Sequence, residues 1–164
     1  MSEAIKYSRG ETQNRLRVEA VGLGQMGVIR DLNRAIFDTD HIINSFDHDD
    51  LVLLLAVTKE RSAPVGFKIG YRMSAEIFYS AKGGVAPGWR RQGIARLLLH
   101  DLMGRAARRG YARFAYDTFP NKHPGMTVLG LDEGFEVTRA GYSARYEDYR
   151  LRFECELEGL EVEG

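Results

Sequence analysis

The chain passes from a predicted strand into a long predicted helix at residues 85–98, whose sequence is VAPGWRRQGIARLL. Pro87 cannot donate a hydrogen bond to a sheet, so it ends the strand. The first N–H groups of a helix have no partner within it and carry partial positive charge, which suits a pyrophosphate. Gly93 and Ala95 are small enough for a ligand to lie against the backbone. These residue types fit equally well a tight corner with solvated arginines.

Hydrophobic periodicity predicts the elements around this stretch. Strands are expected at residues 15–21, 51–58, 65–72, 76–82, 111–117 and 149–157, and helices at 26–37, 90–109 and 126–133. Because the middle strands follow one another directly, a regular βαβ repeat is absent, and the order favours a mixed α/β sheet flanked by helices. A length of 164 residues predicts a single domain over 1–164.

Composition excludes several classes of protein. Lysine plus arginine equals aspartate plus glutamate, 23 against 23, so no overall field attracts nucleic acid or a membrane. Cys155 is the sole cysteine and the four histidines share no metal-binding spacing, so we expect neither an internal disulfide nor a metal. The polar N-terminus and the short apolar run at 51–57 predict a soluble, cytoplasmic protein.

A second glycine motif offers an alternative. Gly22, Gly24 and Gly27 follow a predicted strand and open a helix, as in a dinucleotide-binding fingerprint for NAD. The acidic ribose partner of that motif should end a second strand about twenty residues on. That interval holds the irregular FDTDHIINSFDHDD instead, so the glycines are also explained as a connecting loop.

The first motif resembles a known family. Arg90-Arg91-Gln92-Gly93-Ile94-Ala95 is similar to the Arg/Gln-x-x-Gly-x-Gly/Ala signature of the GCN5-related N-acetyltransferase (GNAT) superfamily. Val85 and Pro87 match the Val-x-Pro turn that precedes this signature, and Gly134-Phe135 resembles a later Gly-Phe block of the family.

The resemblance implies a GNAT fold, with a mixed, mostly antiparallel sheet of six to seven strands, and acetyl-CoA as the acetyl donor. It assigns pyrophosphate or pantetheine binding to a set of residues: Val85, Arg90, Arg91, Gln92, Gly93, Ile94, Ala95, Arg96 and Asn121. A backbone N–H near Val85 would polarise the thioester carbonyl. Homodimers are frequent in the superfamily, so a homodimer is a possible assembly.

The implied activity is acetyl transfer to a primary amine of an unidentified small molecule or peptide. Glu76, in an Ala-Glu-Ile sequence, resembles the base of histone-type members, although its spacing to the loop is three residues longer. A solvated carboxylate at a strand edge explains Glu76 equally well. Gly130 stands where the family commonly has a tyrosine acid, and Tyr116 and Tyr79 are candidate substitutes. This departure keeps a catalytically silent acyl-CoA-binding regulatory module open as an alternative.

Overall fold

The computed structural model describes residues 14–158. Their contacts form two compact units. The first contains the described residues up to Tyr71 together with Ala81–Leu102, and the second contains Arg72–Ser80 and the described residues from Met103 onward. Strand β4 (Ile77–Val85) and helix α3 (Ile94–Arg108) each contribute residues to both units. The expectation of one domain over 1–164 stays a prediction.

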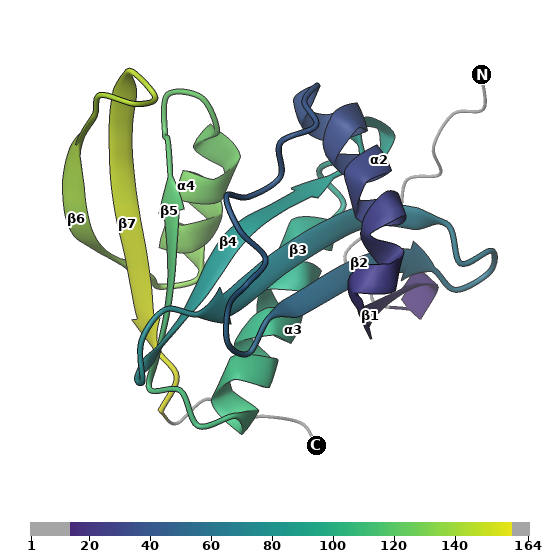
Figure 1. The fold of residues 1–164 in the computed structure, drawn as a ribbon, viewed down its shortest axis with the longest axis horizontal. Coiled ribbons are helices and arrows are strands. Elements are labelled where there is room, and N and C mark those ends of the chain that lie inside the picture. Colours follow the sequence, from purple (N-terminus) through teal and green to yellow (C-terminus); the bar gives the residue numbers. More distant parts are fainter. Residues whose placement is uncertain (1–13, 159–164) are drawn as a thin grey trace. The chain divides into compact units, whose positions relative to one another are not determined.

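The first unit is built from a strand, a helix and a hairpin (Figure 1). Its elements are β1 (Leu16–Val21), the 3-10 turn η1 (Leu23–Gln25), α2 (Met26–Phe37), β2 (Val52–Thr58), β3 (Pro64–Arg72) and the 3-10 turn η2 (Pro87–Trp89). Strand β2 pairs antiparallel with both β1 and β3. Every residue of β2 is buried, which explains its continuous apolar sequence.

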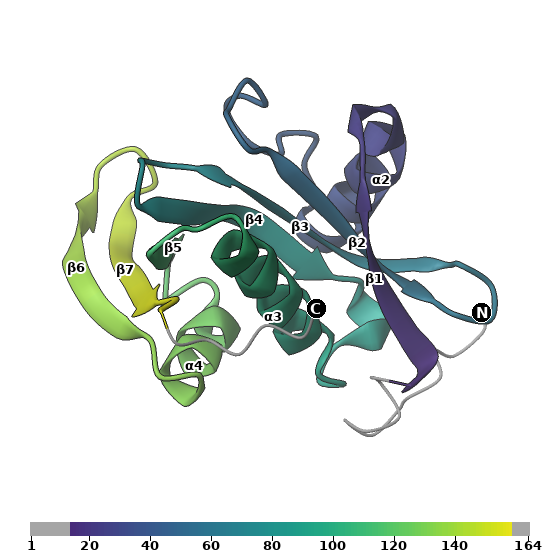
Figure 2. The same ribbon diagram turned by 90° about the horizontal axis from the view of Figure 1, so that it is seen from below.

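Helices α2 and α3 lie on opposite faces of the strands of the first unit (Figure 2). Ile29 and Leu32 of α2 pack on side chains of β2 and β3 from one face. On the other face, a Cβ at Gly66 of β3 would lie 3.2 Å from Leu98 of α3, so α3 packs directly on the backbone of β3. The apolar periodicity of each helix is therefore satisfied by a different side of the sheet.

The second unit carries the C-terminal strands and an aromatic core. Its further elements are β5 (Arg113–Thr118), α4 (Pro124–Asp132), β6 (Glu136–Ser143) and β7 (Asp148–Glu156). Phe78, Phe114 and Phe153 are fully buried. Helix α3 ends in a Schellman motif, in which Gly110 has a φ of +87° and Tyr111 N–H donates to Ala106 O at 3.2 Å.

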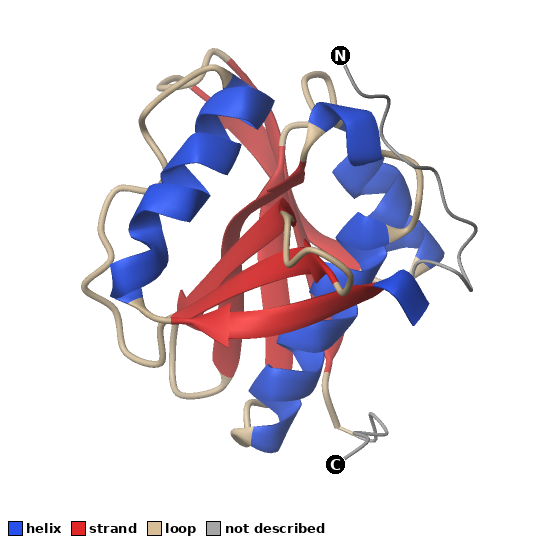
Figure 3. Cartoon of the chain, turned by 90° about the vertical axis from the view of Figure 1, so that its right-hand side faces the viewer, coloured by secondary structure: helices blue, strands red, loops and turns tan. Residues whose placement is uncertain are grey.

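The strands are hydrogen-bonded in the order β1-β2-β3-β4-β5-β7-β6. The only parallel pairing recorded among the described strands is that of β4 with β5. The prediction of a mixed, mostly antiparallel α/β sheet flanked by helices is thereby confirmed (Figure 3). Among residues 14–158, no helix is long and apolar enough to cross a membrane.

Three expectations about individual elements were wrong. Strand β6 was not predicted, because its residues are nearly all exposed and show no apolar alternation. Helix α3 begins at Ile94 rather than Arg90, because Arg91 and Gly93 adopt positive φ and cannot belong to a helix. The alternation of apolar and charged residues along 149–157 predicts that Tyr149 faces the core, but it is 60% exposed and its ring packs against Tyr142.

Candidate active site

The C-terminal end of β4 is the first part of the candidate site. Val85, the last residue of β4, is buried, and the next N–H group, that of Ala86, donates to Val65 O of β3 at 2.8 Å. Pairing of β4 with β5 runs only from Ile77 to Ser80, five residues before β4 ends. The later part of β4 thus has no ladder partner on β5 among the described residues, as expected for a strand that offers backbone groups to a ligand.

The loop after β4 turns sharply into α3. Arg91 has a φ of +63° and Gly93 a φ of +83°, both in the left-handed region. A side chain at residue 93 would be strained there, which accounts for the glycine. Gln92 lies between them with only 4% of its surface exposed and anchors the loop. The sequence signature therefore corresponds to one fixed backbone conformation.

The first turn of α3 directs its N–H groups away from the helix. Ile94 is buried beneath the turn, whereas Ala95 is exposed. The first N–H group of this region with a helical partner is that of Leu97, which donates to Gly93 O at 3.0 Å. Helix geometry leaves the preceding N–H groups without partners inside the helix, at its positive end.

Arginines supply further positive charge at this turn. Arg90 and Arg91 are exposed, and Arg96 is partly buried. Arg90 is fixed near the end of β4, because its Nε donates to Val85 O at 3.3 Å. The structure thus brings together eight predicted binding residues in one continuous segment: Val85, Arg90, Arg91, Gln92, Gly93, Ile94, Ala95 and Arg96. Such a turn suits a phosphate group.

The paired glycines before Val85 are explained by packing within the protein. A Cβ at Gly84 would lie 3.0 Å from Ile36 of α2, and a Cβ at Gly83 would lie 3.0 Å from Phe67 O of β3. Glycines within a strand are typical of a bulge or of the close approach of a ligand or another part of the chain. The close approach that the structure shows is that of α2 and β3 themselves.

Lys68 is a buried cation beside this strand that sequence reasoning missed. Its residue is 5% exposed, and its Cγ would lie 3.2 Å from a Cβ at Gly83. No hydrogen bond or ion pair of Lys68 is recorded with another residue of 14–158. Burial without an acid lowers the pKa of Lys68 to about 8. The position of Lys68 between Phe67 and Ile69, in a strand of mainly apolar residues, is the sequence feature that could have indicated its burial.

Glu76 occupies the opposite end of β4. Its side chain is exposed in the turn before the strand, and its carbonyl accepts hydrogen bonds from the N–H groups of Ala112 and Arg113. An extended strand rises about 3.3 Å per residue, so roughly 30 Å of chain separates Glu76 from Val85. The structure does not bring this candidate base together with the end of β4.

Asn121 lies in the turn that follows β5. Its Nδ2 donates to Asp148 Oδ1 at 3.0 Å, so it fixes the start of β7. The Asn121 amide and the N–H of Tyr149 stabilise the Asp148 carboxylate and lower its pKa. Asn121 thus has a structural contact of its own, and its contact with pantetheine stays a prediction.

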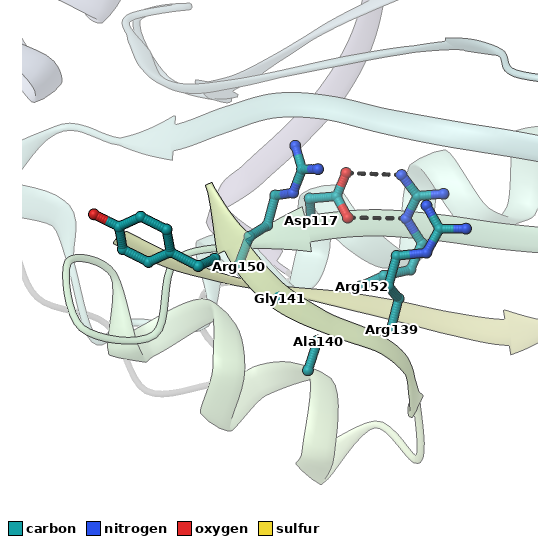
Figure 4. Close-up of a pocket in the computed structure, with 7 residues that line it drawn as sticks. Asp117, Arg139, Ala140, Gly141, Arg150 and Arg152 are labelled. Atoms are coloured by element: carbon teal, nitrogen blue, oxygen red, sulfur yellow. Dashed lines mark hydrogen bonds and ion pairs between the residues drawn. The ribbon is translucent and has the colours of Figure 1, made fainter. Parts of the chain in front are cut away.

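Neither tyrosine considered as a substitute acid has a free hydroxyl. Tyr116 donates to Met126 O at 2.8 Å, and burial raises its pKa well above the usual value. Tyr79 donates to Asp117 Oδ2 at 2.8 Å, and Asp117 also binds Arg152. This Tyr79–Asp117–Arg152 group was not anticipated, because its members come from three separate strands. It borders a pocket lined by four charged side chains (Figure 4).

The second glycine motif lies between a strand and a helix but lacks the parallel βαβ unit of a dinucleotide site. Strand β1, which precedes it, pairs antiparallel with β2, so the parallel βαβ unit does not form. Gly22, Gly24 and Gly27 have no positive φ, and an added Cβ would meet nothing within 4 Å at any of them. Gly22 and Gly24 form the connecting turn between β1 and α2, and Gly27 lies in the first turn of α2.

Comparisons with solved structures place this architecture. The chain is similar to a GNAT family acetyltransferase from Elizabethkingia anophelis with acetyl-CoA bound, with 18% identity, a TM-score of 0.74, and 87% of this chain and 99% of that chain covered. It is similar to the ribosomal-protein-S18-alanine N-acetyltransferase from Escherichia coli, with 12% identity, a TM-score of 0.72, and coverage of 89% and 99%. It is also similar to a spermidine/spermine N-acetyltransferase from Vibrio cholerae, with 14% identity, a TM-score of 0.68, and coverage of 89% and 95%.

At these identities the likenesses show the fold alone. A search of curated proteins found no significant match to the sequence. The model of the acetyltransferase (GNAT) domain family, however, matches residues 14–119, which include β4, the Val85–Ala95 loop and α3. The chain therefore belongs to the GNAT acetyltransferase family.

Proposed function

We propose that the protein is an acetyl-CoA-dependent N-acetyltransferase that acetylates a primary amine. The observation that carries the proposal is the loop between β4 and α3. Its two left-handed residues, Arg91 and Gly93, lead into a helix turn whose N–H groups have no partners within the helix. The solved relative with acetyl-CoA bound supports the choice of donor.

Different residues of the loop would bind different parts of acetyl-CoA. The backbone N–H groups of Gly93 to Ala95 would donate to pyrophosphate oxygens, and the guanidinium groups of Arg90 and Arg91 would neutralise their charge. The end of β4 at Val85, which has no ladder partner on β5 among the described residues, would bind the pantetheine arm and donate to the thioester carbonyl.

Acetyl transfer then requires a neutral amine and a leaving thiolate. The amine nitrogen attacks the thioester carbon, the C–S bond breaks, and the amine proton passes to solvent. Glu76 is too far along β4 from Val85 to receive that proton directly, so the proposal assigns it no catalytic step. A thiol of pKa about 8.5 leaves without a strong acid near neutral pH, so Gly130 is compatible with turnover.

Thiol release from acetyl-CoA over a panel of primary amines tests the proposal. We expect at least one amine to accelerate release, and Ala95→Glu to abolish the acceleration by placing an anion on the phosphate-binding turn. A chain that binds acetyl-CoA but releases no thiol with any amine would instead be the silent acyl-CoA-binding module. The engaged hydroxyls of Tyr116 and Tyr79 are the observations that favour this second candidate.

A further inference from the structure

Four charged side chains line a pocket on strands β5, β7 and β6 (Figure 4). Asp117 of β5 lies opposite Arg152 of β7, and Arg152 in turn lies opposite Arg139 of β6. Arg150, two residues before Arg152, projects from the same face of β7 because side chains alternate along a strand. All four side chains belong to the second unit.

The carboxylate in the pocket is already fully engaged. Arg152 binds Asp117 through two hydrogen bonds, Nε to Oδ1 at 2.8 Å and Nη2 to Oδ2 at 2.9 Å. The hydroxyl of Tyr79 adds a third at 2.8 Å. The exposed fractions of the Arg152 and Asp117 side chains are 20% and 12%, so this pair is a fixed part of the pocket wall.

The other two arginines form no ion pair within the described part of the chain, although the charge of Arg150 contributes to the lowered pKa of Asp117. Among residues 14–158, no hydrogen bond or ion pair is recorded for Arg139 or Arg150. Arg139 directly faces Arg152 across the strand pair, an arrangement that is unfavourable between like charges. Glu154, the next acid along this face of β7, is bound to Thr138 and Arg113. The pocket therefore holds two more positive than negative groups.

The pocket also has space for a ligand. Gly141 of β6 lies opposite Arg150, and a Cβ built on it would meet nothing within 4 Å. We propose that this pocket binds the carboxylate or phosphate group of a small molecule, held between Arg139, Arg150 and the fixed Arg152. Planar guanidinium groups match the geometry of both oxyanions and bind them by paired hydrogen bonds.

Calorimetric titration tests the proposal directly, at a fixed ionic strength of about 0.15 M, which screens weak surface attraction. The probes are O-phosphoethanolamine and β-alanine, and their neutral counterparts ethanolamine and β-alaninamide are the controls. We expect saturable binding of at least one oxyanion probe and none of its counterpart. The double variant Arg139→Gln/Arg150→Gln should weaken binding by about tenfold or more, the scale of lost charge-assisted hydrogen bonds.

Both replaced arginines are exposed, so the double variant should fold normally, and equal melting temperatures would verify this. Arg61→Gln, which removes an exposed arginine from the turn between β2 and β3, is the matched control and should bind like the wild type. Absence of saturable binding by both oxyanion probes at millimolar concentration would overturn the proposal. So would equal affinity in the double variant.

Turnover distinguishes two sources of the anion. If the oxyanion belongs to the acetyl acceptor, kcat/KM should favour a probe over its neutral counterpart, and the double variant should remove the preference. If it belongs to a separate effector, the probe should bind without being acetylated. Either outcome supports the pocket. The titration needs no turnover, so the anion site and the proposed acetyl transfer can fail independently.

Discussion

At the scale of single residues, Gly130 of α4 has no space for a side chain. A Cβ at this position would lie 2.1 Å from the Tyr116 hydroxyl and 3.0 Å from Phe153. The hydroxyl is held there by its hydrogen bond to Met126 O. The absence of tyrosine at position 130 therefore follows from the packing of Tyr116, which occupies the space beneath the helix.

Gly130→Ala should consequently lower the free energy of unfolding by about 1–3 kcal/mol, the usual cost of overpacking a core. Gly125→Ala in the same helix meets nothing within 4 Å and is the matched control, expected to be neutral or slightly stabilising. Urea unfolding measures both. In Gly130→Ala combined with Tyr116→Phe, the loss should be smaller than the sum of the single losses. Additive losses would show that the hydroxyl is not the obstacle.

Lys68 gives a prediction for the dependence of stability on pH. Burial lowers its pKa from 10.5 to about 8, so between these values the unfolded chain binds a proton that the folded chain does not. Stability from this group therefore rises as pH increases from 8 to 10.5, and at pH 7 the charged amine costs about 3 kcal/mol.

Lys68→Met should raise the free energy of unfolding at pH 7 by about 1–3 kcal/mol. This gain over the wild type should shrink as pH rises toward 10.5, because the wild-type amine becomes neutral. Urea unfolding at several pH values measures the difference. The exposed Lys59→Met serves as the control and should show no such trend. A gain for Lys68→Met that is constant with pH would contradict the assignment.

At the scale of elements, the two ends of β4 have different roles. Val85 at its C-terminal end leads into the turn that we propose binds phosphate, whereas Glu76 precedes its N-terminal end in an exposed turn. The register with β5 begins at Ile77 and stops at Ser80, so only the start of β4 is held by that strand.

Glu76→Gln should therefore change kcat by less than about threefold, whereas loss of a positioned base usually costs 10²-fold or more. The measurement is the steady-state rate with the best amine of the panel, with acetyl-CoA saturating. A hundredfold drop in kcat, together with a shift of the acidic limb of the pH–rate profile, would restore Glu76 as the base.

We expect the connection between β1 and α2 to bind neither acetyl-CoA nor NADH. Gly24→Ala fills open space at a residue without positive φ. We expect its affinity for acetyl-CoA to stay within about threefold of the wild type, well below the 1.4 kcal/mol of a tenfold change. NADH should show no saturable binding to either protein at millimolar concentration. Saturable NADH binding that Gly24→Ala abolishes would reinstate the dinucleotide interpretation.

Sequence periodicity predicted the buried elements well, because a buried face requires apolar residues at a regular spacing and that spacing is visible in the sequence. Helix α2 was expected at residues 26–37 and spans Met26–Phe37, since one of its faces packs on the sheet. Strand β6 was not predicted, because both of its faces are exposed and its sequence therefore shows no apolar alternation. The start of α3 was misplaced because left-handed φ at Arg91, a residue type with no preference for it, leaves no trace in the sequence.

In the candidate site too, some residues could be located from the sequence and others could not. The turn that we propose binds phosphate could be located in the sequence because its residues are contiguous and its Gly93 reflects a left-handed backbone conformation. The Asp117–Arg152 pair could not, because it joins strands that are 35 residues apart in the chain. The two residues meet because of the register between β5 and β7, and no local sequence pattern encodes that register.

For the molecule as a whole, we expect acetyl-CoA binding at the turn that begins α3 to appear as a gain in stability. Ligand binding to the folded state stabilises it by about 2.7 kcal/mol at a hundred times Kd. For a protein of this size each kcal/mol raises the melting temperature by about 2–4 °C. Saturating acetyl-CoA should therefore raise the melting temperature of the wild type by several degrees.

Ala95→Glu provides the most direct test, because residue 95 is exposed in the first turn of α3, where a glutamate is compatible with helix stability. The melting temperature would be measured with and without acetyl-CoA for the wild type, Ala95→Glu, the neutral Ala95→Gln and the distant Gly24→Glu. We expect a rise in the wild type and in Gly24→Glu, a smaller rise in Ala95→Gln and none in Ala95→Glu. An undiminished rise in Ala95→Glu would show that this turn does not bind acetyl-CoA.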